Sequence, residues 1–257
     1  MRYCMGGMYM EQNDIISINR SYWDENANAW FGTTALPEYG VYFVTEDELH
    51  LFGDVADKRL LEIGCGSGHS LAHHAAHGAA ELWGIDLSKS QLENAREHLR
   101  KNGHAARLIC SPMEADCGIP DGYFDIVYSI YALGWTTDLP ATLRRIYGYL
   151  KPGGMLIFSW RHPVHGCVKI EDGTLIFRNS YFDERPETVD MGNGTAIFPN
   201  RKISSYVNAL ADTGFVIEKL IEETDAQTRA AAGEMPDRMR KAQMLPFSFL
   251  FRARKRN

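Results

Sequence analysis

Apolar residues along the middle of the chain gather in short runs that alternate with amphipathic segments. Each run is flanked by glycine, proline or charged residues, which is typical of strands that are buried on both faces. The segments between the runs repeat apolar residues every three or four positions, as helices do. This alternation predicts a parallel sheet with helices on both faces. The predicted strands span residues 60–63, 82–86, 107–110 and 155–160, and residues 124–133 are predicted to form a further strand with its exit loop.

The N-terminal part of the chain follows a different pattern. Residues 17–30 repeat aromatic and aliphatic residues at helical spacing, and a second short helix is expected at 46–49. We therefore expect residues 1–50 to form an N-terminal helical cap. Residues 1–10 are rich in methionine and contain two glycines, so we expect them to be poorly ordered.

Residues 51–257 are expected to form the main domain. Within it, the alternation of strand and helix stops at about 161–200, where Pro, Asn, Gly and aromatic residues mix. Long inserted segments are more often functional than accidental, so this stretch is predicted to be a lid-like insertion. Beyond it we expect a helix at 200–213, strands at 215–221 and 247–253, and a helix within the polar segment 222–245.

Three glycines follow the first predicted strand at alternate positions, Gly64, Gly66 and Gly68. Glycine permits positive φ and removes the Cβ that would keep a ligand away from the backbone. The helix expected from about Ser67 presents unpaired N–H groups, which suit a carboxylate or another anion. The loop therefore predicts a small polar ligand at the carboxyl edge of the sheet.

The spacing of these glycines separates two classes of ligand. A dinucleotide-binding loop has the pattern G-x-G-x-x-G, which would require glycine where this chain has His69. Glu62 stands two residues before Gly64, and its carboxylate would repel a pyrophosphate but can accept from an ammonium group. The pattern therefore favours a ligand with an ammonium group over a dinucleotide.

A second acid, Asp86, ends the second predicted strand. A carboxylate at this place in an α/β sheet can accept hydrogen bonds from both hydroxyls of a ribose. Charge-assisted bonds of this kind are worth about 1.5–3 kcal/mol each. Asp86 therefore predicts a nucleoside cofactor.

Composition narrows the classes of function. Of the 257 residues, 45% are apolar and 23% are charged, as in an ordinary globular protein with a sizeable core. The net charge of −6 disfavours a nucleic-acid groove, which needs a basic surface. Five cysteines without C-x-x-C pairing predict a reduced, cytoplasmic chain. The sequence has no apolar run of 18 residues, so no membrane-spanning helix is expected.

Three stretches together resemble the class I S-adenosylmethionine-dependent methyltransferases, of the bacterial type 11 kind that acts on small molecules. Residues 60–68 match motif I of the family, residues 124–133 resemble motif II, and the Leu-Lys-Pro-Gly-Gly sequence at 150–154 matches motif III closely. The resemblance implies a Rossmann-like α/β fold. Its sheet would be seven-stranded and mostly parallel, with strand order 3-2-1-4-5-7-6 and helices on both faces.

The resemblance also implies a cofactor, S-adenosyl-L-methionine, with S-adenosyl-L-homocysteine as product. In the family the glycine loop holds the amino-acid end, the acid of the second strand holds the ribose, and the loop after the third strand meets the adenine. Carried over to this sequence, with Asp116 as an alternative to Glu114, the cofactor residues are Glu62, Gly64, Cys65, Gly66, Gly68, Asp86, Leu87, Met113, Glu114 and Ser129.

The methyl acceptor is expected to be a small molecule. His162 and His165, just past the fifth strand, and Tyr131, past the fourth, are the titratable groups best placed for catalysis. An acceptor pocket is predicted from Tyr22, Trp23, Trp30 and Tyr181. His69, His73 and His77 share one helix face, but no carboxylate or cysteine completes a zinc pattern, so no metal is expected. The protein is expected to be a monomer or a homodimer.

The sequence is also compatible with three other functions. A nicotinamide-dependent oxidoreductase would use a similar loop, although His69 and Glu62 count against it. A non-catalytic protein that binds S-adenosylmethionine would share all the motifs. A methyltransferase acting on protein or tRNA would differ only in its acceptor; base methylation is disfavoured because the Asn/Asp-Pro-Pro-aromatic and Pro-Cys motifs are missing.

Overall fold

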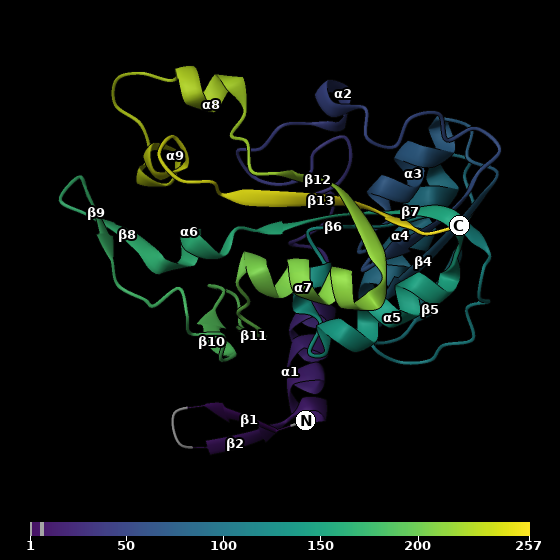
Figure 1. Cartoon of the computed structure of the whole chain (residues 1–257), viewed down its shortest axis with the longest axis horizontal. Helices are drawn as coiled ribbons and strands as arrows, with labels where there is room; N and C mark the ends of the chain where they lie inside the picture. The colour runs from purple at the N-terminus through teal and green to yellow at the C-terminus, as the bar shows by residue number, and fades with distance from the viewer. Residues whose placement is uncertain (1, 6–7) are drawn as a thin grey trace.

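A computed structural model describes residues 2–5 and 8–257 (Figure 1). Its centre is a seven-stranded sheet in the order β12-β13-β7-β6-β3-β4-β5. Neighbouring strands from β5 to β7 are parallel, and β13 runs antiparallel to both β7 and β12. Numbered along the chain, these strands have the order 3-2-1-4-5-7-6, which confirms the predicted sheet. The strands are β3 (Arg59–Ile63), β4 (Glu81–Asp86), β5 (Arg107–Cys110), β6 (Phe124–Ile130), β7 (Leu150–Arg161), β12 (Phe215–Ile221) and β13 (Ser248–Lys255).

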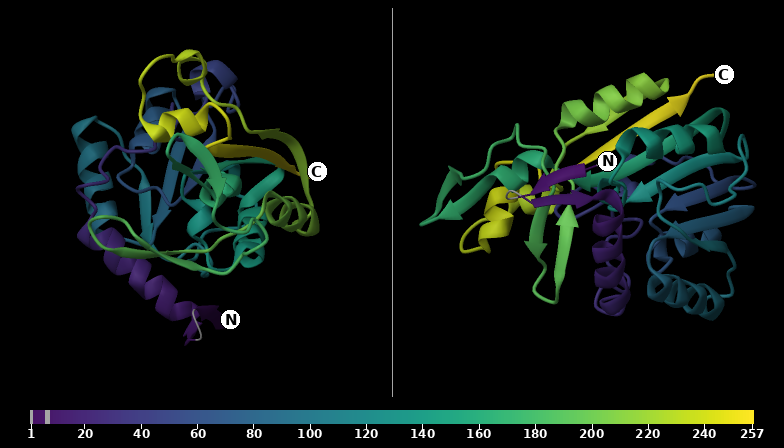
Figure 2. Two further views of the ribbon diagram at one scale, coloured as in Figure 1. Left: turned by 90° about the vertical axis from the view of Figure 1, so that its left-hand side faces the viewer. Right: turned by 90° about the horizontal axis from the view of Figure 1, so that it is seen from below.

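Helices cover both faces of the sheet (Figures 1 and 2). Alternate residues of β3 point to opposite faces, so Leu60 and Leu61 belong to different cores. The core around Leu61 includes residues of α5 (Leu139–Tyr149) and α7 (Ile203–Thr213). The core around Leu60 includes residues of α3 (His69–Ala76), α4 (Lys89–Lys101) and the segment that contains α2 (Glu46–Leu49).

β7 begins earlier than the sequence pattern predicts. Leu150 pairs with Phe124 and Met155 pairs with Ile126, so the four residues 151–154 bulge out between two paired positions. Gly153 has φ of +73°, which is the left-handed conformation that such a bulge needs. The Lys-Pro-Gly-Gly sequence therefore shapes the start of this strand as well as the end of α5.

The N-terminal helix α1 spans Gln12–Glu25, and β1 (Arg2–Met5) and β2 (Met8–Glu11) form a hairpin before it. The predicted helix at 17–30 is therefore wrong at both ends. α1 ends early because the Asn26 side chain donates to the carbonyl of Tyr22 at 2.8 Å, and the chain then continues in turns. The expected disorder of residues 1–10 includes residues 1, 6 and 7, which lie outside the described residues, and it stays a prediction.

The insertion after β7 forms two hairpins. α6 (Pro163–Cys167) leads into a hairpin of β8 (Val168–Glu171) and β9 (Thr174–Phe177), which extends away from the sheet in Figure 1. β10 (Glu187–Asp190) and β11 (Thr195–Phe198) form the second hairpin, which lies against α1. The Asn19 side chain of α1 donates to the carbonyl of Ile197 at 2.9 Å and accepts from its N–H at 2.8 Å.

The polar segment before the last strand contains two short helices, α8 (Ala226–Ala230) and α9 (Asp237–Ala242). Residues 231–236 separate them, and this stretch includes Gly233 at positive φ and Pro236 at the N-cap of α9. Among the described residues, none of the helices is both long and apolar enough to cross a membrane. The fold thus leaves the carboxyl ends of the parallel strands bordered by α1, the second hairpin and α9.

Candidate functional site at the carboxyl ends of the parallel strands

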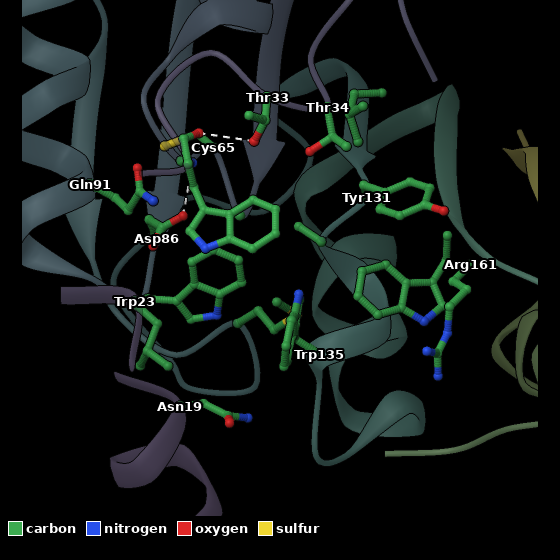
Figure 3. Close-up of a pocket in the computed structure, with 18 of the residues that line it drawn as sticks. Asn19, Trp23, Thr33, Thr34, Cys65, Asp86, Gln91, Tyr131, Trp135 and Arg161 are labelled. Atoms are coloured by element: carbon green, nitrogen blue, oxygen red, sulfur yellow. Dashed lines mark hydrogen bonds between the residues drawn. The ribbon is translucent and has the colours of Figure 1, made fainter. Parts of the chain in front are cut away.

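A cavity of about 510 Å³ lies where the parallel strands end (Figure 3). It is lined by residues from the ends of β3, β4, β6 and β7, together with α1, the second hairpin and the segment before β13. Most of its wall is apolar, and aromatic rings from five different segments face it. We call the part near the glycine loop the cofactor half; it is formed by Gly64–Gly66, Asp86, Leu87, Gln91 and Met113. We call the other part the acceptor half; it is formed by Tyr131, Trp160, Arg161, His165, Arg238 and Phe247.

The three glycines after β3 have different roles, although all have positive φ. A Cβ on Gly64 would overlap the Cβ of Ala132, so this glycine permits close packing against the exit of β6. A Cβ on Gly68 would lie 3.0 Å from the Cβ of Ala95 in α4, and Gly68 lies outside the cavity wall. A Cβ on Gly66 would face the cavity, with the Gln91 side-chain oxygen 3.9 Å away. Gly66 is therefore the glycine that keeps space for a ligand.

Asp86 is tied to the glycine loop by its carboxylate. Oδ2 accepts from the N–H of Gly66 at 2.8 Å, and Oδ1 accepts from the N–H of Ser88 at 2.9 Å. Burial raises the pKa of Asp86 to about 6, although these hydrogen bonds favour the ionised form. A carboxylate has about four acceptor positions, so the ionised group can accept two more hydrogen bonds from a ligand.

Glu62 lies at the bottom of the cavity and is almost fully buried. Its Oε2 accepts from the Tyr128 hydroxyl at 3.3 Å. Burial raises the pKa of Glu62 well above its ordinary value, and the charge of Asp86 adds to this. A cation placed beside Glu62 would lower that pKa again, because it favours the ionised carboxylate.

The loop after β5 brings Met113 and Glu114 to the cavity wall. Glu114 is held in place because one of its oxygens accepts from the hydroxyls of Thr136 and Thr137, each at 2.9 Å. Asp116, the alternative to Glu114, is exposed and pairs with Arg145 at 3.5 Å outside the cavity wall. The geometry therefore favours Glu114 over Asp116 as a ligand-facing residue.

Ser129 does not reach the cavity, contrary to the expectation for a cofactor residue. It is fully buried, and its hydroxyl donates to the carbonyl of Ile63 at 2.8 Å. The hydrogen bond joins β6 to β3 just below the glycine loop. Side chains alternate along a strand, so Ile130 reaches the cavity wall where Ser129 does not. Cys65 and Leu87, by contrast, both line the cavity as expected.

The four residues predicted for the acceptor pocket separate into two groups. Trp23 and Trp30 line the cavity, with their ring centres 5.7 Å apart. Tyr22 lies outside the cavity wall, because its hydroxyl accepts from the Trp30 indole at 2.9 Å and donates to Asn193 at 3.1 Å. Tyr181 lines a separate cavity, and its hydroxyl accepts from the N–H of Ile203.

The two histidines past β7 also have different environments. His162 is buried beneath the cavity wall, with Nε2 2.6 Å from the Glu222 carboxylate and Nδ1 accepting from the N–H of Val164. His165 lines the cavity and packs on Phe247, with ring centres 3.9 Å apart. Burial and the nearby positive charges of Lys241, Arg161 and Arg238 lower the pKa of His165 to about 3, so its imidazole is neutral at neutral pH.

Tyr131 takes an uncommon backbone conformation at the end of β6, with φ of +55°. Its hydroxyl lies 2.9 Å from the Ser248 hydroxyl, and burial raises the pKa of the phenol. Its ring lies in the cavity wall, next to Trp160, with ring centres 5.4 Å apart. Of the three catalytic candidates, the structure brings Tyr131 and His165 to the cavity and leaves His162 outside.

Several known proteins are similar to this chain in sequence or in fold. A family model described as a methyltransferase domain matches residues 61–158. An S-adenosylmethionine-dependent methyltransferase from Mesorhizobium loti is 26% identical, with a TM-score of 0.67 over 80% of this chain and 95% of that one. A structure from Listeria monocytogenes assigned to the same class is 25% identical, with a TM-score of 0.70 over 82% and 96%. Residues 61–158 therefore form a methyltransferase domain, and the chain is similar in sequence and fold to S-adenosylmethionine-dependent methyltransferases.

Curated relatives of the chain match it over shorter stretches. An uncharacterized protein of Haemophilus influenzae is 36% identical over 124 residues, which are 47% of this chain and 49% of that protein. A ubiquinone biosynthesis O-methyltransferase of Aromatoleum aromaticum is 32% identical over 137 residues, 52% of this chain and 58% of that protein. The chain thus spans about half the length of these curated relatives.

The cofactor of this family is S-adenosylmethionine, and the cofactor half of the cavity fits it. Gly66 leaves the loop surface free of a side chain, and Asp86 keeps acceptor positions for hydroxyl groups. The side-chain oxygen of Gln91 is buried without a hydrogen-bond partner among the described residues. A volume of about 510 Å³ is within the ordinary range for cofactor sites.

Several residues of the cavity were not predicted from the sequence. Gln91 is an example: its N–H donates to the Ser88 hydroxyl as part of the helix cap, and this local role hides the side chain's place in the cavity wall. Arg161 ends β7, so the rule that ligands lie at the carboxyl ends of strands would have found it. Arg238 and Phe247 carry no such signal, because only the folding of the segment before β13 brings them to the cavity.

Asp86 should make cofactor binding dependent on pH. Its pKa is raised to about 6, so the fraction of ionised carboxylate, which accepts from hydroxyls, falls as the pH drops through that value. We expect the dissociation constant for S-adenosylmethionine, measured by calorimetry, to be constant above about pH 7 and to rise below about pH 6. Asp86→Asn should remove this dependence and weaken binding by about 1–3 kcal/mol at neutral pH.

Glu62→Gln is the control for this pH profile, because Glu62 is the other buried acid of the cofactor half. If the dependence persists in Asp86→Asn and disappears in Glu62→Gln, Glu62 and not Asp86 is the group that titrates.

Proposed function

We propose that this protein transfers a methyl group from S-adenosylmethionine to a small-molecule acceptor. The observation that carries the proposal is a single cavity that joins a glycine loop and Asp86 at one end to a wall of aromatic rings at the other. Figure 3 shows Asp86 and Gln91 on one side, Trp23 and Trp135 in the middle, and Tyr131 and Arg161 on the far side. A donor and an acceptor can therefore occupy the same cavity.

In this proposal the loop from Gly64 to Gly66, with Glu62 beneath it, holds the amino-acid end of the cofactor. Asp86 accepts from the ribose hydroxyls, while Leu87, Met113 and Glu114 border the adenine. When bound, S-adenosylmethionine supplies an electrophilic methyl group on a sulfonium. The chain's own contribution is alignment and exclusion of water, because such a transfer needs no electrophilic activation by the protein.

Tyr131 and His165 are the proposed groups for orienting the acceptor by hydrogen bonds. The neutral imidazole of His165 has an unprotonated nitrogen that can accept a hydrogen bond, but a pKa lowered to about 3 makes it a weak base. Its Nε2 is buried without a hydrogen-bond partner in the part of the chain that the structure describes. The Tyr131 hydroxyl, held by Ser248, can only orient an acceptor, since its raised pKa keeps the phenol protonated.

The second hairpin is the proposed lid of this cavity. Val189, Met191 and Phe198 of the hairpin region line the cavity, and Asn19 fixes the hairpin to α1. The acceptor is proposed to be a small molecule because the enclosed aromatic cavity suits one, and because curated relatives include ubiquinone biosynthesis O-methyltransferases.

Calorimetry with S-adenosylmethionine and, separately, with NADH tests the cofactor. We expect binding of S-adenosylmethionine and no heat from NADH; tight binding of NADH would contradict the proposal. Incubation with a panel of small acceptors should then produce S-adenosylhomocysteine, detected by mass spectrometry. Binding of the cofactor without this product from any acceptor would favour a non-catalytic protein. Competition by polyanions with a steep salt dependence would favour a nucleic-acid acceptor.

A further inference from the structure

The acceptor half of the cavity contains two arginines without an acidic partner. Arg161 lies at the end of β7, with its guanidinium carbon 5.1 Å from the ring centre of Phe198. Arg238 lies in α9, with its guanidinium carbon 4.6 Å from the ring centre of Phe247. Neither guanidinium has a hydrogen bond or an ion pair with any of the residues described in the structure. Each offers five N–H donors that no protein group uses.

Some arginines elsewhere in the chain have acidic partners, whereas exposed ones such as Arg20, Arg96 and Arg144 have none among the described residues. Arg145 pairs with Asp116, and Arg252 and Arg254 both pair with Glu218. Water can satisfy an exposed guanidinium such as that of Arg238, but Arg161 is half-buried against an aromatic ring in the wall of a cavity. Leaving a partly buried charge without a partner costs free energy, so a ligand that supplies the partner would bind favourably.

The charges around the cavity are also divided between its two halves. The carboxylates that line it, Glu62, Asp86 and Glu114, surround the cofactor half or its border and already accept hydrogen bonds from the protein. In the acceptor half, Arg161 and Arg238 both contribute to lowering the pKa of His165, which leaves that imidazole neutral. The acceptor half therefore has a positive potential that no carboxylate in its wall offsets.

We propose that the methyl acceptor is an organic anion whose carboxylate or phosphate pairs with Arg161 and Arg238. This rests on the proposed methyltransferase function and adds the charge of the acceptor to it. A guanidinium can bind a carboxylate or phosphate through two parallel hydrogen bonds, which fixes orientation as well as position. The apolar body of the acceptor would lie against Trp160 and Phe247, and a cationic acceptor would be repelled by both arginines.

Pairs of ligands that differ only in charge test this inference. We would titrate 4-hydroxybenzoate against 4-hydroxybenzamide, octanoate against octanamide, and phenyl phosphate against phenol, in the presence of saturating S-adenosylhomocysteine. At least one anion should bind about tenfold or more tightly than its neutral counterpart, and this preference should shrink as salt is added. The carboxylate and phosphate arms show which anionic group the arginines prefer.

Arg161→Met and Arg238→Met keep an apolar stem of similar length and remove the charge. Each should weaken binding of the preferred anion about tenfold while leaving its neutral counterpart unchanged. Arg144→Met, on the exposed face of α5, is the matched control and should change neither. The dissociation constant for S-adenosylhomocysteine should stay the same in all three variants.

Two results would overturn the inference. Equal affinity for anions and their neutral counterparts in the native protein, including no measurable binding of any pair, contradicts it directly. Weaker binding of S-adenosylhomocysteine in Arg161→Met would show that the arginine holds the carboxylate of the cofactor instead. If the proposed methyltransferase function is wrong, the result differs from both of these: S-adenosylmethionine does not bind, or no acceptor is methylated.

Discussion

Gly66→Val is expected to abolish binding of S-adenosylmethionine while the protein still folds. The Cβ of a residue at this position faces the cavity, where the nearest described protein atom is the Gln91 side-chain oxygen at 3.9 Å. A branched side chain there would occupy the space proposed for the amino-acid end of the cofactor. We expect the dissociation constant, measured by calorimetry, to rise at least about 100-fold, which corresponds to roughly 2.7 kcal/mol or more.

Backbone strain needs its own control, because Gly66 has φ of +48° and valine disfavours that region. Gly122 has φ of +59° and open space around its Cβ position, and it lies in the turn before β6, away from the cavity. The Gly122→Val variant should therefore be destabilised about as much as the Gly66→Val variant, but its affinity for the cofactor should not change. Unchanged affinity in a folded Gly66→Val protein would refute the role of the loop.

Gly134→Ala is expected to destabilise the protein and to narrow the acceptor half of the cavity. A Cβ on Gly134 would overlap the indole ring of Trp160, which is buried between Tyr131, Trp135 and Phe198. The indole would have to move toward the cavity or the backbone would have to shift. Overpacking of this kind costs about 1–3 kcal/mol, which denaturant unfolding measures as a lower midpoint.

A double-mutant cycle separates the overlap from other effects of the alanine. Trp160→Leu removes the indole, so Gly134→Ala should cost much less in that background than in the native protein. Gly148→Ala is the matched control, because its Cβ would meet only the end of the Asp121 side chain among the described residues. S-adenosylmethionine affinity should stay within about twofold in Gly134→Ala, since the cofactor half is not touched. Equal costs in both backgrounds would contradict the steric explanation.

The sheet and the cofactor half could be predicted because their signals are local. A buried strand, a glycine turn and an acid at the end of the next strand each depend on a few neighbouring residues, and the topology of parallel sheets brings them to one edge. Asp86 illustrates this, because the predicted strand end lies within hydrogen-bonding distance of the predicted loop. The prediction that Ser129 lines the cofactor site is wrong by one position: its strand was predicted correctly, but the neighbouring side chain, that of Ile130, faces the cavity.

The acceptor half could not be predicted in the same way, because its residues come from segments far apart in the chain. Tyr22 and Trp23 are neighbours in α1, and only the packing of the second hairpin decides that Tyr22 turns toward Asn193 while Trp23 faces the cavity. His162 and His165 likewise lie in one short segment, but Glu222 holds the first away from the cavity. Helical spacing identifies a face of a helix, and it does not identify the partner of that face.

The double hydrogen bond between Asn19 and Ile197 has a consequence for how molecules enter and leave. A single side-chain amide imitates the edge of a neighbouring strand and joins the hairpin to α1 through two hydrogen bonds, so we expect the two to move together. Trp23 belongs to the same helix, and Asn19 itself lines the cavity. We therefore expect that turnover requires the hairpin and α1 to swing as a whole, so that the donor and acceptor sites become accessible together and not one after the other.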